Sequence, residues 1–189
     1  MPDSNLELII QLRKELHNKP EPSMHEINTK RILMDFIQTH THSLEVVDMR
    51  SWFYAVKKGN NHENPIAFRA DYDAVTCADG SCRHLCGHDG HSAVLAGFAL
   101  WLDTAKLERD VYLIFQPGEE NGKGAAICSS IIDEYCIGIS KPANGCIKAP
   151  RATCLSCRQV FLFSIILLFL DLFLVSLLSF RFRHVQASL

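Results

Sequence analysis

Apolar residues recur at helical spacing twice within the first forty positions of the chain. The set that predicts a helix ending near His17 is Leu6, Ile9, Ile10 and Leu16. The set that predicts a second amphipathic helix is Ile27, Leu33, Met34 and Ile37. Pro20 and Pro22 break the chain between them. Ser23 and Glu26 have the spacing of a capping box, so we expect them to start the second helix.

Three apolar runs further along the chain predict strands, at residues 52–56, 65–71 and 111–115. The run at 111–115 is continuously apolar, which is typical of a central strand covered on both faces. Residues 89–102 and 125–135 have helical patterns instead. Because strands alternate with helices, the pattern predicts an α/β sandwich with a mixed sheet.

The character of the sequence changes near residue 136. Residues 1–135 mix charged, polar and apolar side chains as a globular domain does, and 136–159 read as a linker. Residues 160–180 carry a single charge, Asp171, and are long enough for a bilayer, which takes about 20 residues. We therefore expect an apolar helix there. Its pattern fits a transmembrane segment, but a non-native tail without function is favoured, because membrane anchoring is not a feature of the family described below.

Charge and cysteine content narrow the possible functions. The chain has 21 acidic and 19 basic residues, a net charge of −2, which gives no indication of a nucleic-acid partner. It has eight cysteines, but its N-terminus does not resemble a secretory signal. Free thiols at Cys77, Cys82 and Cys86 in a reducing compartment are therefore favoured over a disulfide scaffold.

Three polar segments stand where a predicted strand ends or a predicted helix begins, which is where open α/β sheets place their sites. They are residues 69–73 (RADYD), 86–91 (CGHDGH) and 116–120 (QPGEE). Acidic residues at a strand end, read alone, are more often solvated than functional. A thiolate and an imidazole two residues apart can reach one ion if the glycine between them makes a tight turn. The two adjacent carboxylates of the QPGEE segment face different directions, so one can bind a metal while the other forms a hydrogen bond with the water on that metal.

Taken together, these segments resemble a known family. The stretches HNKPEPSMHE, FRADYDAV, CGHDGHSAVLAG and FQPGEENGKGA occur in one order over roughly residues 6–135. They resemble the amidohydrolase branch of the co-catalytic metallopeptidases, which includes aminoacylases, hippurate hydrolases and plant auxin-conjugate hydrolases. The resemblance implies a mixed-sheet sandwich of the zinc-exopeptidase type, a cytoplasmic location and hydrolysis of N-acyl-amino acids or short peptides.

The resemblance also implies a role for each motif residue. Cys86, His88 and Glu120 match metal ligands of the family. Glu119 matches the general base that takes a proton from the attacking water, and Asp73 matches the acid that orients the site. The implied cofactor is a divalent metal, Zn²⁺ or Mn²⁺, as one or two ions. Thiolate ligation favours Zn²⁺, whereas Mn²⁺ is an option that the resemblance adds.

The sequence departs from the family after residue 135. The family continues with a metal-binding histidine, a lid and dimerisation domain through which it forms homodimers, and another metal-binding histidine. Here the only later histidine is His184, to which we assign no role. We therefore expect a truncated sandwich with three of five ligands. The alternative is that the chain is an inactive fragment, which at most binds metal weakly and associates with membranes.

Thiol catalysis by Cys86 is disfavoured, because a cysteine nucleophile needs no adjacent pair of glutamates.

Overall fold

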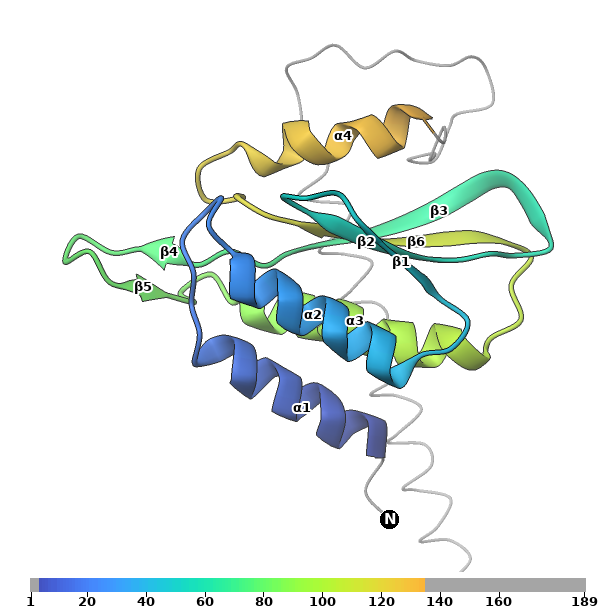
Figure 1. Ribbon diagram of the computed structural model, residues 1–189, viewed down its shortest axis with the longest axis horizontal. Coiled ribbons are helices and arrows are strands. Elements are labelled where there is room, and N and C mark those ends of the chain that lie inside the picture. The colour runs from blue at the N-terminus through green and yellow to red at the C-terminus, as the bar shows by residue number, and fades with distance from the viewer. Residues whose placement is uncertain (1–3, 135–189) are drawn as a thin grey trace, which may run out of the picture. The chain divides into compact units, whose positions relative to one another are not determined.

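Residues 4–134 are described by the computed structural model, and they form a mixed α/β fold (Figure 1). The helices are α1 (Ser4–His17), α2 (Ile27–His40), α3 (His88–Thr104) and α4 (Gly124–Glu134). The strands of the main sheet are β1 (Glu45–Asp48), β2 (Phe53–Lys57), β3 (Asn61–Asp71) and β6 (Arg109–Gln116). Two short strands, β4 (Val75–Thr76) and β5 (Cys82–Arg83), make a separate hairpin. The expected mixed-sheet α/β architecture is thus present in these residues.

The main sheet has the order β1-β2-β6-β3. Strand β6 pairs antiparallel with β2 and parallel with β3, so it is central, as its continuous apolar run predicted. Residues 110–116 are all buried because helices cover both faces of this strand. The parallel pairing continues to the register Asp71↔Gln116, so β3 and β6 end side by side.

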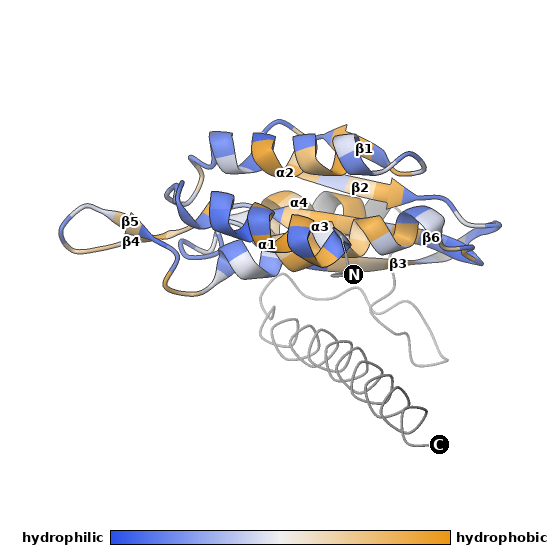
Figure 2. Cartoon of the chain, turned by 90° about the horizontal axis from the view of Figure 1, so that it is seen from below, coloured by the Kyte–Doolittle hydropathy of each residue, from blue (hydrophilic) through white to orange (hydrophobic). Residues whose placement is uncertain are grey.

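Alternate residues of the central strands pack into two apolar layers. On one face, Phe53 and Phe115 stack with ring centroids 4.4 Å apart and pack with residues of α1, α2 and α3. On the other face, Tyr54 and Tyr112 pack with residues of α4. Figure 1 shows the same layers, with α1, α2 and α3 below the sheet and α4 above it. In Figure 2 much of strand β2 has the colour of hydrophobic residues, whereas much of helix α1 has the colour of hydrophilic ones.

The start of α2 differs from the capping box expected at Ser23 and Glu26. Glu26 is the residue before the helix, but its side chain makes no capping hydrogen bond. The carboxylate of Glu21 does so instead, accepting the backbone N–H groups of Asn28 (3.1 Å) and Thr29 (2.8 Å). The expected capping box is therefore wrong, because both of its side chains bind elsewhere in the fold.

Within residues 4–134, no helix has the length and apolar character needed to cross a membrane. The linker expected at 136–159 and the apolar helix expected at 160–180 lie outside the described residues.

Candidate metal centre

The three polar segments converge at one edge of the sheet. Because β3 and β6 are parallel and end side by side, Asp73 and the Glu119–Glu120 pair follow neighbouring strand ends. His88 is the first residue of α3, and Gly87 before it has a left-handed backbone with φ 76°. This glycine conformation turns the chain between Cys86 and His88, as the sequence led us to expect.

One group of donor atoms at this edge could hold a metal ion. One ligand atom each from Cys86, His88 and Glu120 lie within 4.8 Å of one another. The Nε2 atom of His88 is 3.8 Å from Oε1 of Glu120. Ligand bonds of about 2.0–2.3 Å put two atoms that share an ion at most about 4.6 Å apart. A small movement would therefore suffice for all three to reach one cation, and the sulfur, nitrogen and oxygen donors suit a divalent transition metal.

Asp73 fixes the orientation of the His88 ring. Nδ1 of His88 lies 2.9 Å from Oδ1 of Asp73 and 3.1 Å from its backbone oxygen. Both neighbours are acceptors, so we assign the ring proton to Nδ1, which leaves the lone pair of Nε2 for a metal. His88 is 5% exposed and Asp73 is 1% exposed, so neither side chain can turn readily into solvent.

Charges in this cluster shift the pKa of both partners. Burial opposes protonation of His88, but the hydrogen bond that its ring donates to Asp73 and the nearby carboxylates outweigh this effect and raise the pKa of the imidazole. Burial also disfavours ionisation of Asp73, but hydrogen bonds from His88, Ser23 and the Glu120 backbone outweigh it and lower the pKa of Asp73. Both shifts thus favour the charged form of each partner over its neutral form.

Cys86 is exposed, but its thiol is not acidic. The hydrogen bond to Glu120 and the surrounding negative charge raise the pKa of the Cys86 thiol to about 11. A cation between the three side chains would reverse this effect, because it stabilises the thiolate. The same negative charge that keeps the thiol protonated thus favours a bound cation.

The remaining acidic residues of the motifs lie beside this group. Oε2 of Glu119 is 3.9 Å from Nε2 of His88, and the Glu119 side chain is 17% exposed. Asp71 is buried, which raises its pKa in spite of the guanidinium of Arg69. Nε2 of His88 therefore faces both members of the glutamate pair.

Two residues of the centre were not expected from the sequence. The hydroxyl of Ser23 donates to Oδ2 of Asp73 at 2.7 Å, and the backbone N–H of Glu120 donates to the same oxygen at 2.9 Å. The buried carboxylate of Glu26 accepts the backbone N–H of Gly118 at 2.7 Å. Ser23 and Glu26 both belong to the stretch HNKPEPSMHE. Their place in a motif shared with the family could have indicated a role in the centre, but their spacing also fits a helix cap.

Comparison with known sequences points to one family. Residues 67–149 match peptidase family M20/M25/M40. The chain is 32% identical over 139 residues to an N-acetyldiaminopimelate deacetylase of Priestia megaterium, an alignment that covers 67% of this chain and 37% of that protein. It is 35% identical over 136 residues to an uncharacterized hydrolase of Staphylococcus haemolyticus, covering 65% of this chain and 35% of that protein. The chain thus spans little more than a third of these relatives.

Solved structures of similar fold include the YXEP protein of Bacillus subtilis, described as a dinuclear metal-binding peptidase of the M20 family. It superposes with a TM-score of 0.60 and 30% identity over 71% of this chain and 40% of that one. The aminobenzoyl-glutamate utilization protein of Klebsiella pneumoniae superposes with a TM-score of 0.52 and 21% identity, covering 69% of this chain and 42% of that one, so it shows the fold alone.

Proposed function

We infer that this chain is related to the N-terminal part of peptidase family M20/M25/M40, whose family model matches residues 67–149. From that premise, we propose that its candidate centre binds a divalent metal and serves the hydrolysis of an N-acyl-amino acid or a peptide-like amide. The observation that carries the proposal is the convergence of Cys86, His88 and Glu120 within 4.8 Å, with Glu119 beside them. A thiolate ligand favours Zn²⁺, and Mn²⁺ is the alternative.

The residues around the centre suit the chemistry of amide hydrolysis. A bound divalent cation would polarise the amide carbonyl and make a nearby water acidic, lowering the pKa of that water from about 15.7 toward roughly 7. Glu119 would take a proton from this water as the water oxygen attacks the carbonyl carbon. As the C–N bond breaks, Glu119 would return the proton to the amine nitrogen. Asp73 would keep Nε2 of His88 directed at the centre throughout.

Metal content tests the ligand assignment. We expect the purified 189-residue chain to take up Zn²⁺ or Mn²⁺, and Cys86→Ser and His88→Ala to lower the bound metal. Cys82→Ser is the matched control, because this thiol lies on β5 and outside the donor group. Equal metal content in Cys86→Ser and Cys82→Ser would contradict the proposal.

The role of Glu119 is tested separately. The change Glu119→Gln keeps the shape of the side chain but removes its ability to accept a proton. We expect it to leave metal content nearly intact and to abolish whatever hydrolysis of acyl-amino acids the chain supports. Hydrolysis that persisted in this variant would show that Glu119 is not the base.

A further inference from the structure

We propose that Ser23 and Glu26 are positioning residues of the candidate metal centre. They lie in the connection between α1 and α2, and through them this connection holds the loop that carries Glu119 and Glu120. The inference rests on the proposed function, because it assigns these two residues to the same centre.

The first contact reaches the centre through Asp73. Oδ2 of Asp73 accepts both the hydroxyl of Ser23 (2.7 Å) and the backbone N–H of Glu120 (2.9 Å), while Oδ1 lies 2.9 Å from Nδ1 of His88. One carboxylate thus joins α3 to the loop after β6. Ser23 restrains the rotation of that carboxylate, so it fixes the positions of a ring and a backbone group that it does not touch itself.

The second contact reaches the same loop directly. Glu26 is 6% exposed, and its Oε1 accepts the N–H of Gly118 at 2.7 Å. Gly118 lies two residues before Glu120 and has a left-handed backbone with φ 56°. A buried carboxylate is costly unless its hydrogen bonds are made. The fold therefore retains a costly group at the point where the glutamate-bearing loop leaves β6.

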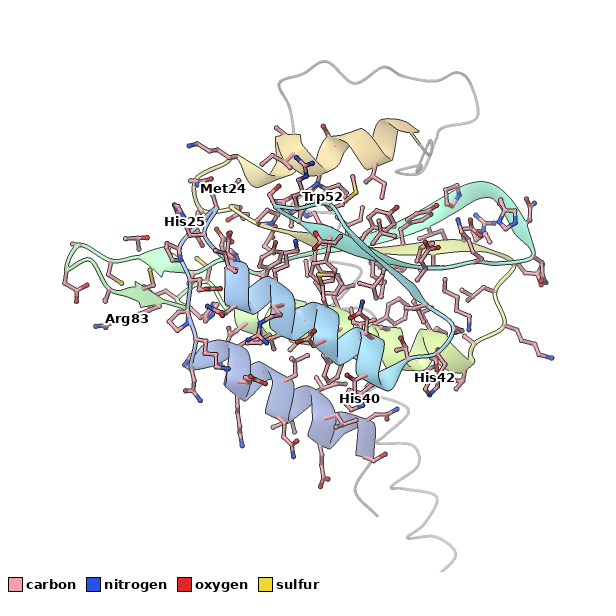
Figure 3. The ribbon with its side chains drawn as sticks, viewed as in Figure 1. Met24, His25, His40, His42, Trp52 and Arg83 are labelled. Atoms are coloured by element: carbon pink, nitrogen blue, oxygen red, sulfur yellow. The ribbon has the colours of Figure 1, made fainter. Side chains whose placement is uncertain are left out.

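The connection itself is anchored at several points, as a positioning element must be. The backbone oxygen of Glu21 accepts the N–H of Ala74, and Pro22 forms a parallel bridge with Ala74. Met24, between Ser23 and Glu26, has a positive φ of 69°, which is uncommon for a residue other than glycine and is found where surrounding contacts enforce it. Figure 3 shows Met24 and His25 at the tip of this connection, beside the loop that leads into α4.

Removing a hydrogen-bond partner of a metal ligand typically lowers metal affinity by about 10–100-fold. We therefore expect Ser23→Ala to weaken the Zn²⁺ affinity of the 189-residue chain about tenfold, the lower end of that range. The effect is smaller because Ser23 contacts Asp73 and not the ligand His88 itself. Glu26→Ala should weaken the affinity to the same extent, whereas Glu26→Gln, which retains an oxygen acceptor for Gly118, should restore most of the affinity. Urea unfolding is measured for every variant. If Glu26 only stabilised the fold, Glu26→Ala and Glu26→Gln of equal stability would bind zinc equally well.

Ser43→Ala is the matched control. The Ser43 hydroxyl also donates to an aspartate, Oδ1 of Asp103 at 2.8 Å, but at the far end of α3. It should change the urea midpoint about as much as Ser23→Ala and leave zinc affinity unchanged. If Ser23→Ala and Ser43→Ala bind zinc equally well, while Cys86→Ser does not, the inference is wrong and the proposed function stands.

Amide hydrogen exchange on the metal-free chain tests the positioning without any metal. Ser23→Ala should remove protection from the Glu120 amide, and Glu26→Ala should remove it from the Gly118 amide. Unchanged protection at both amides would overturn the inference whatever the zinc result. If Cys86→Ser leaves zinc binding intact, the proposed centre is wrong, and exchange at Gly118 and Glu120 still decides whether Ser23 and Glu26 hold the loop.

Discussion

A single carboxylate organises the candidate centre at the scale of residues. Asp73 contacts His88, Ser23 and the backbone of Glu120, and it is itself almost fully buried. Both oxygens of the carboxylate are engaged, so the side chain has little freedom to rotate. The positions of two metal-type side chains, from α3 and from the loop after β6, therefore depend on one residue that would not touch the metal.

Protonation of Cys86 makes metal binding depend on pH. The pKa of its thiol is raised to about 11 and that of His88 is also raised, so protons compete with the cation at both ligands. A raised pKa extends this competition to higher pH. We therefore expect zinc affinity to rise by at least about tenfold per pH unit from pH 7 to 8, because binding releases the thiol proton, and more steeply wherever His88 is protonated as well.

Competition with a chromophoric chelator at pH 6, 7 and 8 measures this slope. The variant Cys86→Ser should bind zinc more weakly, and its affinity should rise less steeply between pH 7 and 8 than that of the wild-type chain. An affinity of the wild-type chain that stays constant over this range would mean that the thiol is not a ligand.

At the scale of elements, the turn between β6 and α4 decides where the glutamate pair lies. The N–H of Gly124 donates to the backbone oxygen of Gly118 at 3.1 Å, which closes the turn. A Cβ atom on Gly124 would collide with the backbone oxygen of Pro117. This turn thus requires a residue without a side chain at its end.

We expect Gly124→Ala to destabilise the fold by about 1–3 kcal/mol, since the backbone of Pro117 would have to move. Gly90→Ala is the matched control, because a Cβ there meets nothing within 4 Å and the residue is helical. That change should stabilise the fold by about 0.5–1 kcal/mol. Urea unfolding of both variants measures the difference, and equal stabilities would contradict the assignment of Gly124 to a crowded turn.

Elements with long patterns were predictable from the sequence. The predictions of a helix ending near His17, of a second helix from Ile27 and of a central strand at 111–115 are confirmed by α1, α2 and β6. Strand β1 has four residues, and β4 and β5 have two each. Such lengths are too short for an alternating pattern to form, so these three strands were missed.

The centre was predictable only as far as its motifs extend. The sequence placed a thiol, an imidazole and carboxylates at element ends, and the fold brings them together. The partners of these groups were not predictable, because Ser23 is 50 residues from Asp73 and Glu26 is 92 residues from Gly118. Only the tertiary fold creates such pairs, and the local spacing of Ser23 and Glu26 fitted a capping box equally well.

At the scale of the whole molecule, the candidate centre is supported from one side. Within residues 4–134, its metal-type donors come from the start of α3 and the loop after β6. The sequence has one histidine after His91, namely His184. Strand β3 pairs with β6 and has no second neighbour among the described strands. A catalytic metal usually needs ligands on several sides and an enclosure that excludes water.

We therefore expect the 189-residue chain, assayed by itself, to turn over hippurate or acetyl-amino acids far more slowly than the roughly 1–10³ s⁻¹ usual for enzymes. The assay uses excess Zn²⁺ or Mn²⁺, with Glu119→Gln as the background. Turnover within the usual range that Glu119→Gln abolishes would show that the described centre suffices, or that another copy of the chain completes it.

The exposed but protonated state of Cys86 has a consequence for its reactivity toward electrophiles. Alkylating reagents attack the thiolate, so access alone does not make a cysteine reactive. With a thiol pKa of about 11, Cys86 should react slowly with iodoacetamide at pH 7.5 despite its exposure. Glu120→Gln should accelerate the modification, because it removes the negative charge next to the sulfur. Peptide mass mapping over time would follow Cys86 individually, and equal rates in both proteins would mean that Glu120 does not hold the proton on this thiol.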